Sequence, residues 1–207
     1  MNDSVHNVKD ELLRELNERM ASQCQCSLRK EATQAVPGSG SASAEIVFIG
    51  EAPGKNEDLK GVPFVGAAGI FLEEMLLSVG LRREDIYITN IVKYRPPENR
   101  DPFPPEISDC AEWLREQITL IDPLLIVTLG RHALNHYLPD QKISEVHGKA
   151  FRKTYASIGT RVLVPLYHPA AALYNGSMRN TLKMDFMRIP AILNTARLEK
   201  ENDVHIA

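Results

Sequence analysis

A chain of 207 residues with a formal net charge of −3 is long enough to bury one hydrophobic core, and it has no overall positive charge that would attract a polyanion. Its content of 43% hydrophobic and 25% charged residues is that of an ordinary globular protein. No apolar run reaches the length of a membrane span, and the N-terminus lacks the basic-then-apolar pattern of a signal peptide. We therefore expect a cytoplasmic protein without membrane contact, and any contact with nucleic acid has to come from a local basic surface.

The predicted elements begin with a helix near the N-terminus, where residues Asp10 to Met20 place four apolar side chains on one face. A stretch of small residues from Thr33 to Ala44 follows and has neither helical nor strand periodicity. We expect a helical extension (1–32), a flexible linker (33–44) and one globular domain (45–200).

Within the domain, short apolar runs of strand type alternate with helical patterns. Strands that alternate with helices form parallel sheets covered by helices. The sequence therefore predicts an α/β fold, a three-layer α/β/α sandwich around a central, mainly parallel four-stranded sheet. The predicted strands are 45–49, 86–92, 124–130 and 162–166. The predicted helices are 70–77, 106–121, one that runs through Ala133 and Tyr137, and one from about 179 to 198.

The loop after the first predicted strand reads G-E-A-P-G-K-N-E-D-L-K-G-V-P-F-V-G-A-A-G (50–69). Gly and Pro by themselves would mark a turn, but this loop also carries three carboxylates and the aromatic residue Phe64. Long loops on a rigid scaffold are usually functional. The loop lacks the Gly-Lys-Ser/Thr ending of a phosphate-binding loop and the spacing of the dinucleotide fingerprint. The loop therefore predicts a functional site that is neither a phosphate-binding loop nor a dinucleotide-binding motif.

Three polar residues, Glu51, Asn90 and His168, lie at or just beyond the carboxyl ends of predicted strands. In a parallel sheet these ends meet at one edge, where open α/β sheets bind their ligands. The sequence therefore predicts that the three residues, far apart in the chain, line one site.

Four motifs follow one another between residues 45 and 192: G-E-A-P-G with E-D and P-F-V-G (50–66), T-N-I-V-K (89–93), R-P-P-E-N-R (95–100) and H-P-A-A (168–171). In this order they resemble the motifs of the family 4 uracil-DNA glycosylases. The resemblance implies a monofunctional repair enzyme that flips deoxyuridine out of DNA and hydrolyses its N-glycosidic bond to release uracil. It also implies uracil-containing DNA as the partner, and we expect a monomer.

The resemblance assigns three residues to the uracil base. Asn90 would read the base edge, because an amide presents a donor and an acceptor side by side. Phe64 would stack on the base, and His168 would donate a hydrogen bond to O2 as negative charge develops there. Taken singly, Asn90 also suits a turn and Phe64 a core position, so the flanking motifs decide in favour of function.

The group that activates or positions the attacking water stays open. Some other members of the superfamily have an Asp at the position of Ala52, which here can only line the base site. The remaining polar candidates, by similarity to family 4, are Glu51, Glu57 and Asn99. Because the transition state is largely dissociative, positioning of the water is sufficient without a strong base.

Basic and polar residues that flank the motifs are candidates for contacts with the DNA backbone, although scattered Lys and Arg usually form a solvated surface. The chain departs from the family at Tyr174, where an Arg is common. The candidates are Lys93, Arg95, Arg100, Ser177 and Arg179.

The resemblance also implies a [4Fe-4S] cluster held by four cysteines, and this chain has only three. When the chain is aligned to the family by its motifs, Gln23 and Tyr94 stand at two of the four cysteine positions. Cys26 and Cys110 stand at the other two, and Cys24 has no counterpart. Such a cluster takes four thiolates. We therefore expect no metal or cofactor, with Tyr94 filling the vacated volume; if a cluster is retained, Cys26 and Cys110 are its ligands and Cys24 is a further candidate.

Two other functions stay open beside uracil excision. The first is a catalytically weak or inactive relative that binds DNA or a protein partner. The second is a glycosylase for another deaminated base, such as hypoxanthine. The intact motifs favour uracil-DNA glycosylase activity over both.

Overall fold

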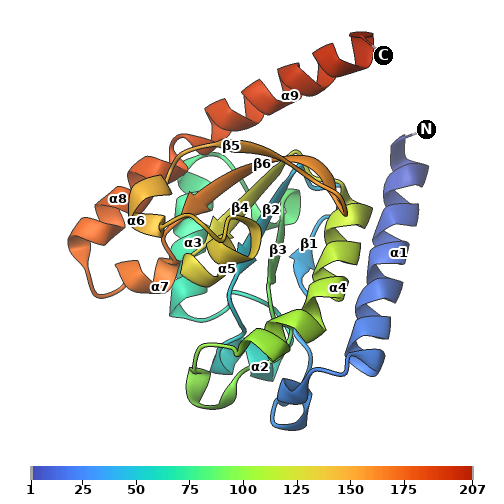
Figure 1. Cartoon of the computed structure of the whole chain (residues 1–207), viewed down its shortest axis with the longest axis vertical. Helices are drawn as coiled ribbons and strands as arrows, with labels where there is room; N and C mark the ends of the chain where they lie inside the picture. The colour runs from blue at the N-terminus through green and yellow to red at the C-terminus, as the bar shows by residue number, and fades with distance from the viewer. Residues whose placement is uncertain (1, 207) are drawn as a thin grey trace.

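A six-stranded sheet with helices on both faces forms the centre of the computed structural model, which describes residues 2–206 (Figure 1). The strand order is β1-β3-β2-β4-β6-β5, with the four inner strands parallel and the two edge strands antiparallel. The strands are β1 (Ser39–Gly40), β2 (Ile46–Gly50), β3 (Tyr87–Asn90), β4 (Leu125–Leu129), β5 (Phe151–Tyr155) and β6 (Gly159–Leu166).

Helices cover the sheet in two layers because alternate residues of the buried strands point to opposite faces. Helices α1, α4 and α5 pack on the face that carries Val47 and Ile126, whereas α3, α8 and α9 pack on the face that carries Phe48 and Val127. The longer helices are α1 (Asn2–Gln23), α3 (Ala67–Ser78), α4 (Pro104–Ile121), α8 (Gly176–Phe186) and α9 (Ile189–Ile206). The shorter helices are α2 (Lys55–Lys60), α5 (Arg131–Tyr137), α6 (Ile143–Val146) and α7 (Pro169–Ala172).

The predicted α/β/α sandwich is confirmed, but the prediction of four strands was wrong. Both missed strands lie at the edges of the sheet. Strand β5 is largely exposed and so lacks the apolar pattern that marks a buried strand, while β1 has only two residues. The predicted last helix is two helices, α8 and α9, because Pro190 has no N–H to continue the hydrogen-bond ladder of the preceding turn.

Residues 33–44, expected to form a flexible linker, lie against the domain. Val36 and Ala42 are fully buried, and the backbone N–H of Val36 donates to the carbonyl of Lys93 at 2.8 Å. The buried carboxylate of Asp58 in α2 accepts from both the backbone N and the hydroxyl of Thr33, at 2.9 and 2.7 Å. The boundaries of the three expected parts stay a prediction. None of the helices within residues 2–206 is long and apolar enough to cross a membrane.

A buried ammonium group connects the end of β3 to α4. The side chain of Lys93 has no exposed surface, and its Nζ donates to Thr89 Oγ1 at 2.7 Å, to the carbonyl of Asn90 at 2.9 Å and to Gln117 Oε1 at 2.8 Å. The prediction that Lys93 contacts DNA was therefore wrong, because its apolar stem and its charge are both enclosed in the core. A lysine can be buried in this way when each ammonium hydrogen has an acceptor.

The amide of Gln117 extends this network to the N-terminal part of the chain. Its Nε2 donates to Asn17 Oδ1 of α1 at 2.7 Å and to the carbonyl of Pro37 at 3.1 Å. Thr89 Oγ1 donates to the same carbonyl at 2.6 Å. The network thus joins α1, the segment before β1, the end of β3 and α4.

Replacement of Lys93 by Met tests this network. We expect the free energy of unfolding to fall by about 1–3 kcal/mol, because buried acceptors lose their donor. Burial lowers the pKa of Lys93 to about 7. Between about pH 7 and the ordinary lysine value of 10.5, the unfolded chain binds a proton that the folded chain has released. The stability of the wild type relative to Lys93→Met should therefore rise with pH in this window, by at most about 1.4 kcal/mol per unit.

Chemical denaturation at a series of pH values measures both effects. Lys60→Met, at an exposed position of α2, is the matched control and should leave the stability curve unchanged. Stability curves of wild type and Lys93→Met that run parallel from pH 7 to 10 would contradict the lowered pKa.

Candidate active site

A cavity of about 350 Å³ opens at the carboxyl ends of the parallel strands. Its walls come from the loops that follow β2, β3 and β6, as expected for an open α/β sheet. The structure brings eight of the predicted site residues together here: Glu51, Ala52, Glu57, Phe64, Asn90, Asn99, Arg100 and His168.

The amide of Asn90 is buried in the wall of this cavity without a hydrogen-bond partner. Asn90 ends β3 and is 1% exposed, and neither its Oδ1 nor its Nδ2 has a partner among the residues that the structure describes. Opposite it in the register of β2 lies Gly50, where a Cβ would come within 2.4 Å of Asn90 Oδ1 and 2.7 Å of the Phe64 ring. Buried polar groups are almost always paired, so this free donor and acceptor fit a ligand with a complementary edge.

The ring of Phe64 forms a second wall and is held by an unusual backbone conformation. Phe64 has φ +53°, a left-handed value that non-glycine residues adopt rarely, and its ring stacks on that of His168 with centroids 5.6 Å apart. The guanidinium of Arg83 donates to the carbonyl of Phe64 at 2.9 Å and to that of Pro63 at 2.7 Å. At Gly69, a Cβ would lie 1.9 Å from the Phe64 carbonyl oxygen, so only glycine fits there. These contacts stabilise the strained conformation and fix the ring.

The carboxylate of Glu57 holds the same loop from the other side. Its Oε1 accepts from the backbone N–H groups of Val65 at 2.9 Å and Gly66 at 2.8 Å, and its Oε2 accepts from that of Gly54 at 3.1 Å. Both oxygens are therefore engaged within the loop. Glu57 lines the cavity, but its main contacts are structural.

The imidazole of His168 has a defined hydrogen-bond pattern. Its Nδ1 accepts from the backbone N–H of Ala170 at 3.1 Å, at the start of α7, so in the neutral ring the proton resides on Nε2. Burial lowers the pKa of His168 to about 4. At neutral pH the ring is therefore an uncharged donor.

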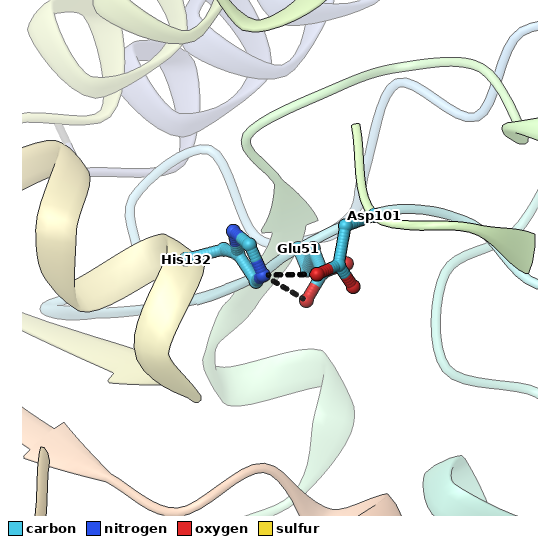
Figure 2. Close-up of side chains that lie close together, drawn as sticks. All are labelled: Glu51, Asp101 and His132. Atoms are coloured by element: carbon cyan, nitrogen blue, oxygen red, sulfur yellow. Dashed lines mark ion pairs between the residues drawn. The ribbon is translucent and has the colours of Figure 1, made fainter. Parts of the chain in front are cut away.

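Glu51 lines the cavity, and its carboxylate lies close to the side chains of His132 and Asp101 (Figure 2). Its Oε2 is 3.8 Å from Nε2 of His132, which is 3.2 Å from Oδ2 of Asp101. One ligand atom of each of the three residues lies within 4.8 Å of the others, as in a metal site. The guanidinium of Arg131, however, already binds Asp101 at 2.5 Å, so the group includes a cation of its own. Burial raises the pKa of Glu51.

The loop after β3 carries Arg95, Asn99 and Arg100 in fixed positions. Arg95 Nε donates to Asn99 Oδ1 at 2.7 Å, and Asn99 has φ +54°. Arg100 forms an ion pair with the buried carboxylate of Glu106 at 2.6 Å and lies over the ring of Phe103 at 3.8 Å. The two guanidinium groups border the site but are already partnered within the protein.

The segment after His168 forms the other rim. Tyr174 is 95% exposed, and Asn175 then caps α8 by accepting from the backbone N–H groups of Ser177 and Met178. Arg179 binds Glu74 at 2.6 Å. Ser177 and Arg179 lie outside the cavity wall, at the N-terminal end of α8.

The three cysteines form a separate buried cluster between α1, α4 and the end of β3. Cys24 and Cys26 both interact with Cys110, and this interaction lowers the pKa of Cys24 to about 6 and raises that of Cys110. Tyr94 is 2% exposed, and its hydroxyl donates to the carbonyl of Ala21 at 3.4 Å. Gln23, the last residue of α1, is exposed.

Sequence reasoning missed three residues that act on the site: Arg83, Asp101 and His132. His132 follows the carboxyl end of β4 by three residues, and this position could have identified it as a candidate site residue. Arg83 lies in a polar turn with nothing to mark it, since its contact with Phe64 crosses 19 residues of the chain.

Comparison with known proteins agrees with this geometry. Residues 37–188 match the family model described as Uracil DNA glycosylase superfamily. The chain is 48% identical to the type-4 uracil-DNA glycosylase of Archaeoglobus fulgidus, over 87% of this chain and 90% of that protein. It is 46% identical to that of Saccharolobus solfataricus, over 86% of each chain, and 41% identical to that of Thermotoga maritima, over 82% and 87%.

The matched region includes the cavity and every residue in its wall, so the similarity covers the site as well as the fold. The chain belongs to the uracil-DNA glycosylase superfamily, in its type-4 branch.

Proposed function

We propose that the chain is a uracil-DNA glycosylase, which hydrolyses the N-glycosidic bond of deoxyuridine in DNA. The observation that carries the proposal is the buried, unpaired amide of Asn90, which lines the same cavity as the stacked rings of Phe64 and His168. A flipped uracil presents N3–H and O4 side by side, which match the acceptor and donor of one amide. The type-4 relatives are named for this activity, and the three residues lie inside the region of similarity.

In this mechanism the base enters the cavity, stacks on Phe64 and pairs with Asn90. Cleavage leaves negative charge on the departing base and positive charge on the sugar. Nε2–H of His168 donates to the base at O2, where it stabilises the developing anion without having to lose a proton first. The low pKa of His168 suits this role, because a neutral donor does not protonate the base prematurely.

We assign the positioning of the attacking water to Glu51. The oxygens of Glu57 already accept three backbone N–H groups, and the amide oxygen of Asn99 already accepts from Arg95. Glu51 lines the cavity, and among the described residues its carboxylate pairs with His132 alone. Glu57 then acts as a brace for the loop that carries Phe64, and Ala52 leaves space next to the base.

The DNA strand crosses the rim between the loop after β3 and the start of α8. Arg95 and Arg100 flank one side, Ser177 and Arg179 the other, and exposed Tyr174 lies beside them. Arg179 can exchange its exposed partner Glu74 for a phosphate at little cost, since surface ion pairs contribute at most about 1 kcal/mol. The monomeric state and the cytoplasmic location stay predictions.

The residues around Cys110 do not fit a [4Fe-4S] cluster held by four thiolates. Three thiols and the phenol of Tyr94 make up the buried donor set, and the side chain of Gln23 is exposed. Tyr94 fills the volume next to the thiols and bonds to α1 instead. We therefore propose that packing replaces the cluster in this protein.

A gel assay on oligonucleotides that carry uracil, hypoxanthine or no lesion tests the function. We expect cleavage at uracil alone after alkaline treatment. Release of hypoxanthine in preference to uracil would favour a different base specificity, and binding of DNA without release of either base would favour an inactive relative.

Asn90→Ala should lower kcat/KM for uracil release by roughly a hundredfold, because two hydrogen bonds to the base are lost, each about 1–3 kcal/mol when its partner stays buried. Single-turnover kinetics on a uracil oligonucleotide measure the loss. Asn194→Ala, at an exposed position of α9, is the matched control and should retain the wild-type rate. Equal rates for Asn90→Ala and wild type would refute base reading by Asn90.

His168→Ala should lower kcat by roughly a hundredfold, the usual effect of losing one donor to a developing anion. Because burial holds the pKa of His168 at about 4, its ring should stay neutral at every pH above about 5. An NMR titration of the imidazole measures this directly. A His168 ring that protonates near pH 6.5 would contradict the proposed neutral donor.

Purified wild-type protein should contain neither stoichiometric iron nor the absorbance of sulfur-to-iron charge transfer. Gln23→Cys combined with Tyr94→Cys restores four cysteines and should gain iron when reconstituted under anaerobic conditions. Four iron atoms per chain in the wild type would overturn the proposal that packing replaces the cluster. The proposal of uracil release does not depend on that result.

A further inference from the structure

Figure 2 shows the side chains of His132 and Asp101, from two other elements, facing the carboxylate of Glu51. His132 and Arg131 lie in the first turn of α5, and Asp101 lies in the loop before α4. Nε2 of His132 is 3.8 Å from Glu51 Oε2 and 3.2 Å from Asp101 Oδ2, so one nitrogen faces two carboxylates. Arg100 donates to the backbone carbonyl of Asp101 at 3.0 Å, and the carboxylate of Asp101 pairs with Arg131 at 2.5 Å.

We propose that His132, held by Asp101, is a positioning residue that orients the carboxylate of Glu51 and keeps it ionised for the reaction in the cavity. The inference rests on the proposed function, because it takes Glu51 as the group that positions the water. It adds a Glu51–His132–Asp101 relay to that function, in which His132 touches neither the base nor the water.

Glu51 needs such a partner because its place in the cavity wall opposes its charge. Burial raises its pKa, and the nearby carboxylate of Asp101 acts in the same direction. The positive charges of His132 and Arg131 act in the opposite direction and favour the ionised form. A protonated Glu51 would offer the water one acceptor fewer and could not take up a proton from it.

Arg131 alone does not serve this purpose. Its guanidinium binds Asp101 at 2.5 Å, and its side chain is 64% exposed, so water screens it from Glu51. Arg131 Nε also lies 3.0 Å from His132 Nε2, a contact in which the neutral ring accepts. On protonation that nitrogen becomes a donor, and the two carboxylates are then its partners. Among the described residues, His132 is thus the one that places a basic side-chain nitrogen within 4 Å of the Glu51 carboxylate, at 3.8 Å.

The test replaces His132 by Gln, which keeps a polar side chain of similar length without the charge. His136→Gln is the matched control, because His136 lies one turn further along α5 and outside the group. The carbon chemical shift of the Glu51 carboxyl, assigned with Glu51→Gln, is followed against pH in the full-length protein. The pH profile of kcat for uracil release is measured in parallel, and thermal unfolding verifies the fold of each variant.

We expect the carboxyl of Glu51 to titrate higher in His132→Gln by roughly half a unit to one unit, and the acid limb of the rate profile to move with it. At pH values on the acid side of this limb, kcat of His132→Gln should be roughly three- to tenfold lower than that of the wild type, with KM unchanged. His136→Gln should match the wild type in both measurements. His132→Lys, which restores a cation, should return the limb toward its wild-type position.

A Glu51 titration that is the same in wild type and His132→Gln overturns the inference. A titration that moves while the rate profile stays fixed overturns the link between His132 and catalysis. A wild type that releases no uracil refutes the proposed function alone, because the carboxyl titration still decides whether His132 controls the charge of Glu51.

Discussion

The site depends on a buried amide that the protein leaves without a partner. Desolvation of an unpaired donor and acceptor costs about 1–3 kcal/mol for each group, so Asn90 keeps its place only because its surroundings hold it there. The backbone of Asn90 continues the parallel ladder with Gly50, and the ammonium of Lys93 binds its carbonyl from within the core. The rigidity of this strand end is what keeps the free amide directed at the cavity rather than folded back onto the chain.

The second wall of the cavity, the ring of Phe64, is likewise held in an unfavourable state by its surroundings. Phe64 has a left-handed backbone, a conformation that costs of order 1 kcal/mol or more for a bulky residue. The loop reaches it because Arg83 binds two carbonyls on one side and Glu57 binds three N–H groups of the loop on the other. Both the amide of Asn90 and the ring of Phe64 are therefore held in place by the protein itself, which reduces the ordering cost of binding a ligand.

The charged side chains around the cavity are mostly paired with one another, and the chain carries no net positive charge. A chain with a net charge of −3 has no general attraction for DNA, and Arg95, Arg100 and Arg179 all have partners inside the protein. Contact with a phosphate then means exchange of an existing partner, which is easy for exposed Glu74 and difficult for buried Glu106. The same principle separates Glu57, whose carboxylate oxygens both accept from the loop, from Glu51, whose ionisable neighbours among the described residues are Asp101, Arg131 and His132.

The sequence alone determined the sandwich of parallel strands, the meeting of Glu51, Asn90 and His168 at one edge, and the family to which the chain belongs. These follow from periodicity, from the rule that parallel strands share a carboxyl edge, and from ordered motifs, all of which are properties of neighbouring residues. Only the tertiary structure decided that Lys93 is enclosed, that Glu57 braces a loop, that Arg83 binds the carbonyl of Phe64 and that His132 lies beside Glu51. Such contacts join residues tens of positions apart, and whether a charge faces water or a partner depends on packing that local pattern does not contain.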